Sequence, residues 1–141
     1  MARIKIQLPQ QFDFSIDIPV RITDLNYGGH VGNDTILSLI HEARMKFLTG
    51  FGYTEIDFEG SSLIMSDVGI EFKAELFYGD MVTAYVAIKD FSRVGFDIYY
   101  KLVKNSEETI IALAKTAMIC YDYQNKKVVS IPAKAREKFT I

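Results

Sequence analysis

Ten residues in the first quarter of the chain combine side chains and glycines suited to holding a reacting carbonyl group. Residues 24–33 read Asp-Leu-Asn-Tyr-Gly-Gly-His-Val-Gly-Asn. Glycine lets backbone N–H groups approach a ligand closely, and a helix that follows points the positive end of its dipole at the same place. The segment therefore favours binding of an anion, or of a carbonyl oxygen that becomes one. Asp, Asn and Gly are also ordinary turn formers, so the segment alone does not decide between the two interpretations.

A strand and a helix flank this segment. Apolar residues alternate with polar or small ones over 14–20, which predicts a strand with one buried face. Pro19 within this run indicates an edge position or a bulge. From about Asp34 the apolar spacing becomes that of a helix of about 16 residues. Asn33 or Asp34 is expected to cap its start, and Gly50 and Gly52 are expected to end it.

The rest of the chain predicts a sheet that wraps this helix. Alternating apolar residues indicate four further strands, at 68–76, 82–88, 96–102 and 109–121. The last of these is apolar on both faces and needs cover on both sides, which one helix cannot supply, so we expect association between subunits. The order of elements predicts an α+β domain over 1–141, with a curved antiparallel sheet of about five strands around one long central helix.

Composition narrows the function classes. The 141-residue chain has a net charge of −2, which gives no electrostatic reason to expect nucleic acid or an anionic membrane surface as a partner. It has no apolar run of the roughly 20 residues that span a bilayer, and its first residues do not resemble a signal peptide. One cysteine, Cys120, and two histidines make a disulfide or a metal site unexpected. We expect a cytoplasmic, metal-free single domain.

Two motifs resemble a known family. Residues 20–33, Val-Arg-Ile-Thr-Asp-Leu-Asn-Tyr-Gly-Gly-His-Val-Gly-Asn, precede His-Glu-Ala-Arg at 41–44. Together they resemble the signature of hotdog-fold acyl-CoA thioesterases, in the branch of 4-hydroxybenzoyl-CoA thioesterase. Tyr-Gly-Asp at 78–80 is similar to a turn between two strands of the same family. The resemblance implies a dimer with one continuous sheet, often paired again into a tetramer. It also implies a substrate tunnel at the dimer interface, no metal or prosthetic group, and coenzyme A only as part of substrate and product.

Thioester hydrolysis needs an activated nucleophile and N–H donors for the oxyanion. The expected donors are the backbone N–H groups of residues 31–33 at the start of the helix. The expected substrate-binding residues are Tyr27, Gly29, Val31, Gly32 and Asn33. The acting aspartate of the 4-hydroxybenzoyl-CoA enzyme aligns with Asn26. Because a carboxamide cannot serve as a general base, the predicted role of Asn26 is to orient the water or the thioester carbonyl.

Several other side chains are candidates for handling the proton. Asp24 precedes Asn26 by two residues, and its alternative role is to fix the loop by accepting N–H bonds. His30 is a plausible proton carrier near neutral pH, and its alternative role is a structural hydrogen bond at the helix entry. Glu42 resembles the helix glutamate of the family motif, but an exposed ion pair with Lys46 explains it more simply. Asp67 is a candidate only if it approaches from a partner chain.

The function predicted from the sequence is hydrolysis of a fatty or aromatic acyl-CoA thioester to the free acid and coenzyme A, catalysed by Asp24, Asn26 and His30. An acyl carrier protein is an alternative carrier. The alternative functions are a non-catalytic acyl-CoA binding module and a hotdog dehydratase or hydratase. The dehydratase or hydratase is less favoured, because His30 of this chain follows two glycines in the loop. Candidate coenzyme A contacts are Arg93, Lys101, Lys104 and Lys115, and candidate acyl contacts are Tyr27, Phe51, Tyr53 and Met65.

Overall fold

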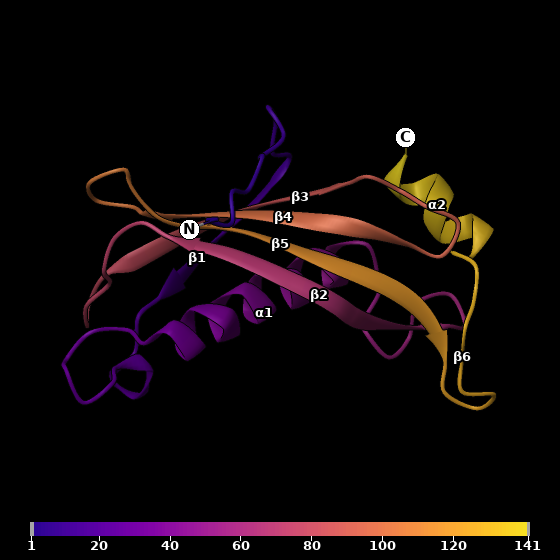
Figure 1. Ribbon diagram of the computed structural model, residues 1–141, viewed down its shortest axis with the longest axis horizontal. Coiled ribbons are helices and arrows are strands. Elements are labelled where there is room, and N and C mark those ends of the chain that lie inside the picture. The colour runs from indigo at the N-terminus through magenta and orange to yellow at the C-terminus, as the bar shows by residue number, and fades with distance from the viewer. Residues whose placement is uncertain (1, 141) are drawn as a thin grey trace.

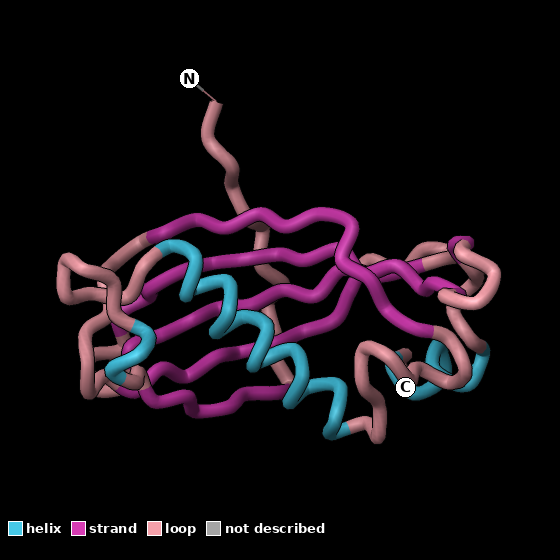
Figure 2. Tube along the Cα trace, turned by 90° about the horizontal axis from the view of Figure 1, so that it is seen from below, coloured by secondary structure: helices cyan, strands magenta, loops and turns pink. Residues whose placement is uncertain are grey.

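A long helix, α1 (Asn33–Gly50), lies diagonally across the concave face of a curved antiparallel sheet (Figures 1 and 2). The computed structural model describes residues 2–140. The strands are β1 (Phe14–Pro19), β2 (Ser62–Phe72), β3 (Met81–Lys89), β4 (Gly95–Lys104) and β5 (Thr109–Asp122), in the spatial order β1-β3-β4-β5-β2. A two-residue strand, β6 (Lys127–Val128), pairs with β5. The predicted α+β arrangement is confirmed.

The core lies between α1 and the inner face of the sheet. Ile40, Ala43 and Leu48 of the helix are fully buried. On the sheet, Ala84 of β3 and Ala112 of β5 are also fully buried. Alanines here leave room for the bulky helix residues, so the helix packs closely against the strands.

The two edge strands differ in how well the sequence predicts them. β1 pairs only with β3, so Pro19 is on an edge strand as expected. The prediction for β2 at 68–76 is wrong in position, because β2 runs over 62–72 and has a bulge between Met65 and Asp67. The alternation of apolar residues continues to Leu76, which is buried from a loop rather than from a strand.

The start of α1 also differs from the expectation. Its N-cap residue is Gly32, not Asn33 or Asp34, and no side chain makes a capping hydrogen bond there. Glycine is accepted at this position because the cap needs no helical backbone angles. The first turn of the helix is thus left without a side-chain cap.

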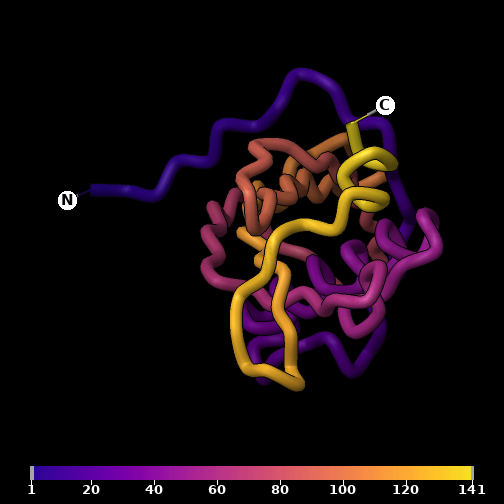
Figure 3. The backbone as a smooth tube through the Cα atoms, turned by 90° about the vertical axis from the view of Figure 1, so that its right-hand side faces the viewer, coloured from indigo at the N-terminus to yellow at the C-terminus, as the bar shows by residue number. Residues whose placement is uncertain are grey.

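Residues 2–13, here called the N-terminal strap, cross the outer face of the sheet, opposite α1 (Figure 3). Phe12 packs against Tyr85 of β3, with ring centroids 6.1 Å apart. The backbone N–H of Ile6 donates to Glu71 of β2 over 2.6 Å, and this bond lowers the pKa of the Glu71 carboxyl. A methyl group on Gly69 of β2 would lie 3.3 Å from Ile6, so the absence of a side chain lets the strap lie close to the sheet.

The short helix α2 (Ala133–Phe139) closes the end of the sheet beyond the last turn of α1 (Figure 1). Phe139 lies within 6.5 Å, centroid to centroid, of the rings of Phe47, Phe51, Tyr53, Phe58, Phe91 and Phe96. This aromatic cluster fixes the C-terminal end of α1. Within residues 2–140, no helix is long and apolar enough to cross a membrane.

Candidate active site

The segment between β1 and α1 folds into a tight turn that ends at the helix. A one-turn 3-10 helix, η1 (Ile22–Asp24), is followed by a bridge between Leu25 and Val31. The N–H of Asn26 donates to the carbonyl of His30 over 2.9 Å, and that of Gly29 donates to the carbonyl of Asn26 over 3.1 Å. Gly29 has a φ of 84°, which favours glycine.

Asn26 lies beside the uncapped start of α1. Its side-chain oxygen accepts a hydrogen bond from the N–H of Gly28 over 2.9 Å. A methyl group on Gly32 would lie 3.6 Å from both Cβ and Nδ2 of Asn26. The carboxamide N–H₂ group and the first turn of α1 are therefore adjacent, as the sequence interpretation requires.

Of the three expected backbone donors, one already has a partner. The N–H of Val31 donates to the carbonyl of Leu76 over 2.9 Å, so it is occupied by the fold. The remaining candidates are the N–H groups of Gly32 and Asn33, at the positive end of the dipole of an 18-residue helix.

His30 lies next to these groups and is half-buried. Its Nδ1 lies 3.3 Å from the carbonyl oxygen of Val31. Its Nε2 lies 3.9 Å from a carboxylate oxygen of Glu75, and Phe77 packs edge-on against the ring. The loop after β2 thus brings two side chains to His30.

A cavity of about 280 Å³ lies at this place. It is lined by His30, Val31, Asn33, Ile36 and the stretch from Phe72 to Leu76. The cavity joins the start of α1 to the loop after β2, so a helix end, an imidazole and a carboxylate share one cavity.

Glu75 is a site residue that was not predicted from the sequence. It is a single, exposed acidic residue in a Lys-Ala-Glu stretch, and no spacing pattern marks it. The signal that was present is its position just before the Tyr-Gly-Asp turn at 78–80, at the end of the strand predicted over 68–76.

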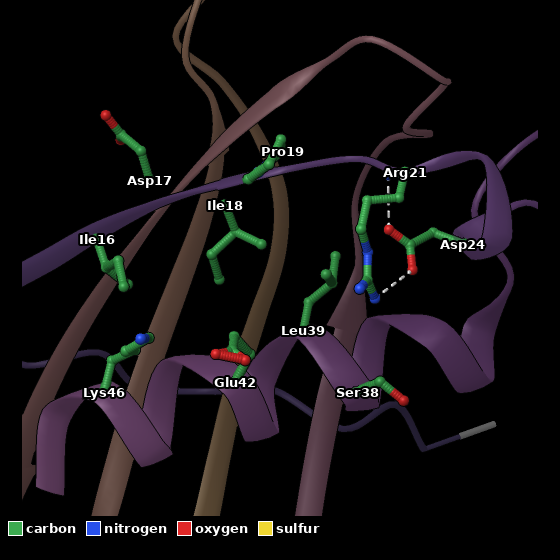
Figure 4. Close-up of a pocket in the computed structure, with 10 residues that line it drawn as sticks. All are labelled: Ile16, Asp17, Ile18, Pro19, Arg21, Asp24, Ser38, Leu39, Glu42 and Lys46. Carbon is green, nitrogen blue, oxygen red and sulfur yellow. Dashed lines mark hydrogen bonds and ion pairs between the residues drawn. The ribbon is translucent and has the colours of Figure 1, made fainter. Parts of the chain in front are cut away.

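Asp24 faces a different cleft (Figure 4). It is 6% exposed, and one carboxylate oxygen accepts a 2.8 Å bond from the N–H of Arg21. The other lies 3.3 Å from the Arg21 guanidinium. Both residues line a cleft of about 320 Å³ between β1 and α1. The observed contacts are those of a residue that fixes the loop, the alternative role considered for Asp24.

Glu42 and Lys46 line the same cleft and are exposed. The expected ion pair between Glu42 and Lys46 is not among the ion pairs within 4.0 Å that residues 2–140 form. An exposed pair gains little free energy and loses side-chain entropy when it forms. Figure 4 shows the Glu42 carboxylate and the Lys46 ammonium apart from each other.

The remaining candidates do not gather at the cavity. Asp67 lies 2.8 Å from Lys115 on the outer face of the sheet, and this hydrogen bond raises the pKa of Lys115. Phe51 and Tyr53 belong to the aromatic cluster at the far end of α1. Tyr27 is fully exposed and Met65 is exposed on β2.

The basic residues proposed for coenzyme A each have a contact of their own. Arg93 donates to Ser130 over 3.0 Å, Lys104 lies 3.4 Å from Asp80, and Lys101 lies over the ring of Phe12. They do not form one phosphate-binding cluster with Lys115.

A buried polar network holds α1 against the sheet. Arg44 of α1 is 5% exposed, and it donates to Glu55 over 3.1 Å and to the Tyr100 hydroxyl over 3.3 Å. The Tyr100 hydroxyl lies 2.7 Å from that of Thr116 on β5. Burial acts to lower the pKa of Arg44, but Tyr100 and Glu55 outweigh it and the pKa is raised. The network fixes the rotation of the helix whose first turn forms the candidate site.

Comparisons of this chain with a family model, with relatives and with solved structures agree on one family. The model of the "Thioesterase-like superfamily" matches residues 20–139. A putative esterase of Aquifex aeolicus is 28% identical over 120 residues, which is 84% of this chain and 91% of the relative. A 1,4-dihydroxy-2-naphthoyl-CoA hydrolase of Microcystis aeruginosa is 28% identical over 116 residues, 80% of this chain and 83% of the relative. The crystal structure of a 1,4-dihydroxy-2-naphthoyl-CoA thioesterase from Synechocystis superposes with a TM-score of 0.80 at 21% identity, covering 89% of this chain and 93% of that one.

Proposed function

The chain belongs to the thioesterase-like superfamily, and on that premise we propose that it hydrolyses the thioester of an acyl-coenzyme A at the start of α1. Thioester hydrolysis is the reaction named by the family, and relatives of similar length act on an aromatic acyl-CoA. One observation carries the assignment to this site. The uncapped first turn of α1 opens on a cavity that His30 and Asn33 line, with the carboxamide of Asn26 beside it.

The reaction proceeds by attack of water on the thioester carbonyl. The N–H groups of Gly32 and Asn33 hold the oxygen that becomes negative, and the helix dipole adds to their effect. Asn26 Nδ2 orients the carbonyl or the water. His30 takes the proton of the attacking water, since both oxygens of Asp24 are engaged by Arg21. The C–S bond then breaks and the thiolate leaves with a proton returned by His30.

We also propose that the protein self-associates as a dimer through β2. Among residues 2–140 this strand pairs only with β5, so its outer edge carries backbone groups with no described strand beside them. Met65, Val68 and Phe72 along it are 38–52% exposed, which is high for apolar side chains on one strand. A second copy that pairs with this edge would cover them and would enclose the nearby cavity.

A second candidate function is supported by the absence of a carboxylate at position 26. A chain that binds acyl-CoA without turnover needs N–H donors for the thioester carbonyl but no general base. The carboxamide of Asn26 can donate a hydrogen bond and cannot act as a base. The substrate carrier, coenzyme A or an acyl carrier protein, is decided by the same experiment.

The test is thiol release from short, medium, long and aromatic acyl-CoAs and from an acyl carrier protein thioester. We expect turnover by the wild type and a loss of about 100-fold or more in kcat for Asn26→Ala, because a donor aimed at the reacting carbonyl is removed. Asn125→Ala, in the turn after β5, is the matched control and should retain full activity. Stoichiometric acyl-CoA binding without thiol release by the wild type would replace the hydrolase by the binding module.

A further inference from the structure

Glu75 is held at the candidate site by the fold of its own loop. Immediately before it, the N–H groups of Lys73 and Ala74 both donate to the carbonyl of Ile111, over 2.8 and 3.2 Å. Immediately after it, the carbonyl of Leu76 accepts the N–H of Val31. The backbone on both sides of Glu75 is thus anchored, once to β5 and once to the residue that follows His30.

The orientation of the His30 ring decides which nitrogen is free. Nδ1 lies 3.3 Å from the carbonyl oxygen of Val31, and a carbonyl only accepts hydrogen bonds, so we assign the proton of the neutral ring to Nδ1. Nε2 then has a free lone pair. It is this nitrogen that lies 3.9 Å from Glu75, in the cavity that both side chains line.

We propose that Glu75 is a positioning residue that stabilises the imidazolium form of His30 during hydrolysis, and so supplies the carboxylate that Asn26 lacks. This inference rests on the proposed function. The attacking water gives one proton to Nε2 while its oxygen bonds to the thioester carbon. Glu75 stays ionised throughout, and its negative charge lies close to the positive charge that has formed on the ring. The proton on Nε2 passes to the departing thiolate when the C–S bond breaks.

The other charged groups near the ring are less well placed. Lys73 lines the cavity, but its ammonium lies 3.3 Å from the carboxylate of Glu71. The carboxylate of Asp34 lies beside Gly32, 2.7 Å from where a methyl group on that glycine would be. Within residues 2–140, Glu75 is the carboxylate found within 4.0 Å of a His30 ring nitrogen.

The kinetic test compares Glu75→Gln with Glu107→Gln, a matched change in the turn between β4 and β5. We expect Glu75→Gln to lower kcat about tenfold or more while KM changes little. The pH dependence of kcat should change in Glu75→Gln and stay as in the wild type in Glu107→Gln. In a His30→Ala background, Glu75→Gln should cause no further loss. Unchanged kinetics, or an equal loss in both backgrounds, overturns the inference while leaving the proposed function standing.

A second measurement does not need turnover. The chain has two histidines, and His41 lies 2.7 Å from Glu55, so its NMR signal serves as an internal control. At one fixed pH we expect the ring signals of His30 to shift in Glu75→Gln, because a charge beside the ring is removed, with those of His41 unchanged. His30 signals that do not move overturn the inference. Absence of turnover by the wild type, with the change in the His30 signals present, overturns the proposed function and leaves the pairing of His30 with Glu75 established.

Discussion

Replacing Tyr100 by Phe removes one oxygen atom from the network that fixes α1 and leaves no cavity. Tyr100 and Thr116 are both 0% exposed, and Arg44 is 5% exposed. The change leaves an Arg44 N–H and the Thr116 hydroxyl without the partner they share. Each buried polar group that loses its partner costs about 1–3 kcal/mol, while Arg44 keeps its bond to Glu55. We therefore expect the free energy of unfolding to fall by about 2–4 kcal/mol.

The assay is unfolding by heat and by denaturant. With an unfolding entropy of about 0.3 kcal/mol/K for a chain of this length, the Tm should fall by about 7–13 °C. Thr116→Val is the matched second change, because it removes the other hydroxyl at nearly constant volume. Added to Tyr100→Phe, it removes one of the two unpaired groups and should recover about 1–2 kcal/mol.

Two results would refute this reasoning. A loss below about 0.5 kcal/mol for Tyr100→Phe would mean that the hydroxyl contributes nothing net to the fold. Strict additivity of Tyr100→Phe and Thr116→Val would mean that the two hydroxyls do not interact, despite the 2.7 Å between them.

Two further predictions concern Gly95 at the start of β4 and Asp122 at the end of β5. Gly95→Ala should destabilise the protein by about 3 kcal/mol or more in denaturant unfolding, because its methyl group would lie 2.1 Å from the backbone carbonyl of Met118. Gly50→Ala, which meets nothing within 4 Å, is the control and should be neutral or slightly stabilising. Hydrogen bonds from the side chain and backbone of Asn125 lower the pKa of Asp122 in the folded protein. At a pH above the ordinary pKa of an aspartate, the ionised carboxylate therefore stabilises the fold. This stabilisation is lost as the pH falls through the pKa that Asp122 has in the folded protein. Asp122→Asn should be less stable than the wild type at pH 7, and the difference should shrink as the pH falls below the ordinary pKa of an aspartate. A difference that stays constant over this range would contradict the assignment.

Local patterns predicted the elements whose burial follows a simple period. The alternation at 82–88, 96–102 and 109–121 gave β3, β4 and β5 nearly to their ends. Pro19 marked an edge strand for the physical reason that it cannot donate to a ladder. β2 was misplaced because a bulge at Ser66 interrupts its period and because Leu76 is buried by tertiary contacts outside any strand.

The features that escaped prediction depend on contacts between distant parts of the chain. The sequence alone favours a surface position for Arg44 on an amphipathic helix. Its burial depends on hydrogen bonds to Glu55 and Tyr100, which lie 11 and 56 positions further along the chain. Glu75 and His30 are 45 positions apart, and nothing in either local sequence indicates that their side chains meet. The loop at 24–33 leads into α1 as predicted, but the separation of Asp24 from His30 into two clefts depends on how η1 turns the chain.

The N-terminal strap has a consequence for how this sheet can be stacked. Two sheets that pack face to face lie about 10 Å apart, a spacing filled by a single layer of interdigitating side chains. The strap runs over β3, β4 and β2 between Phe12 and Ile4, and Figure 2 shows its first residues projecting past the rim of the sheet. A length of backbone occupies the layer that a second sheet would need. The strap therefore prevents a second sheet from packing on this outer face, and removal of residues 2–13 should expose the face to such packing.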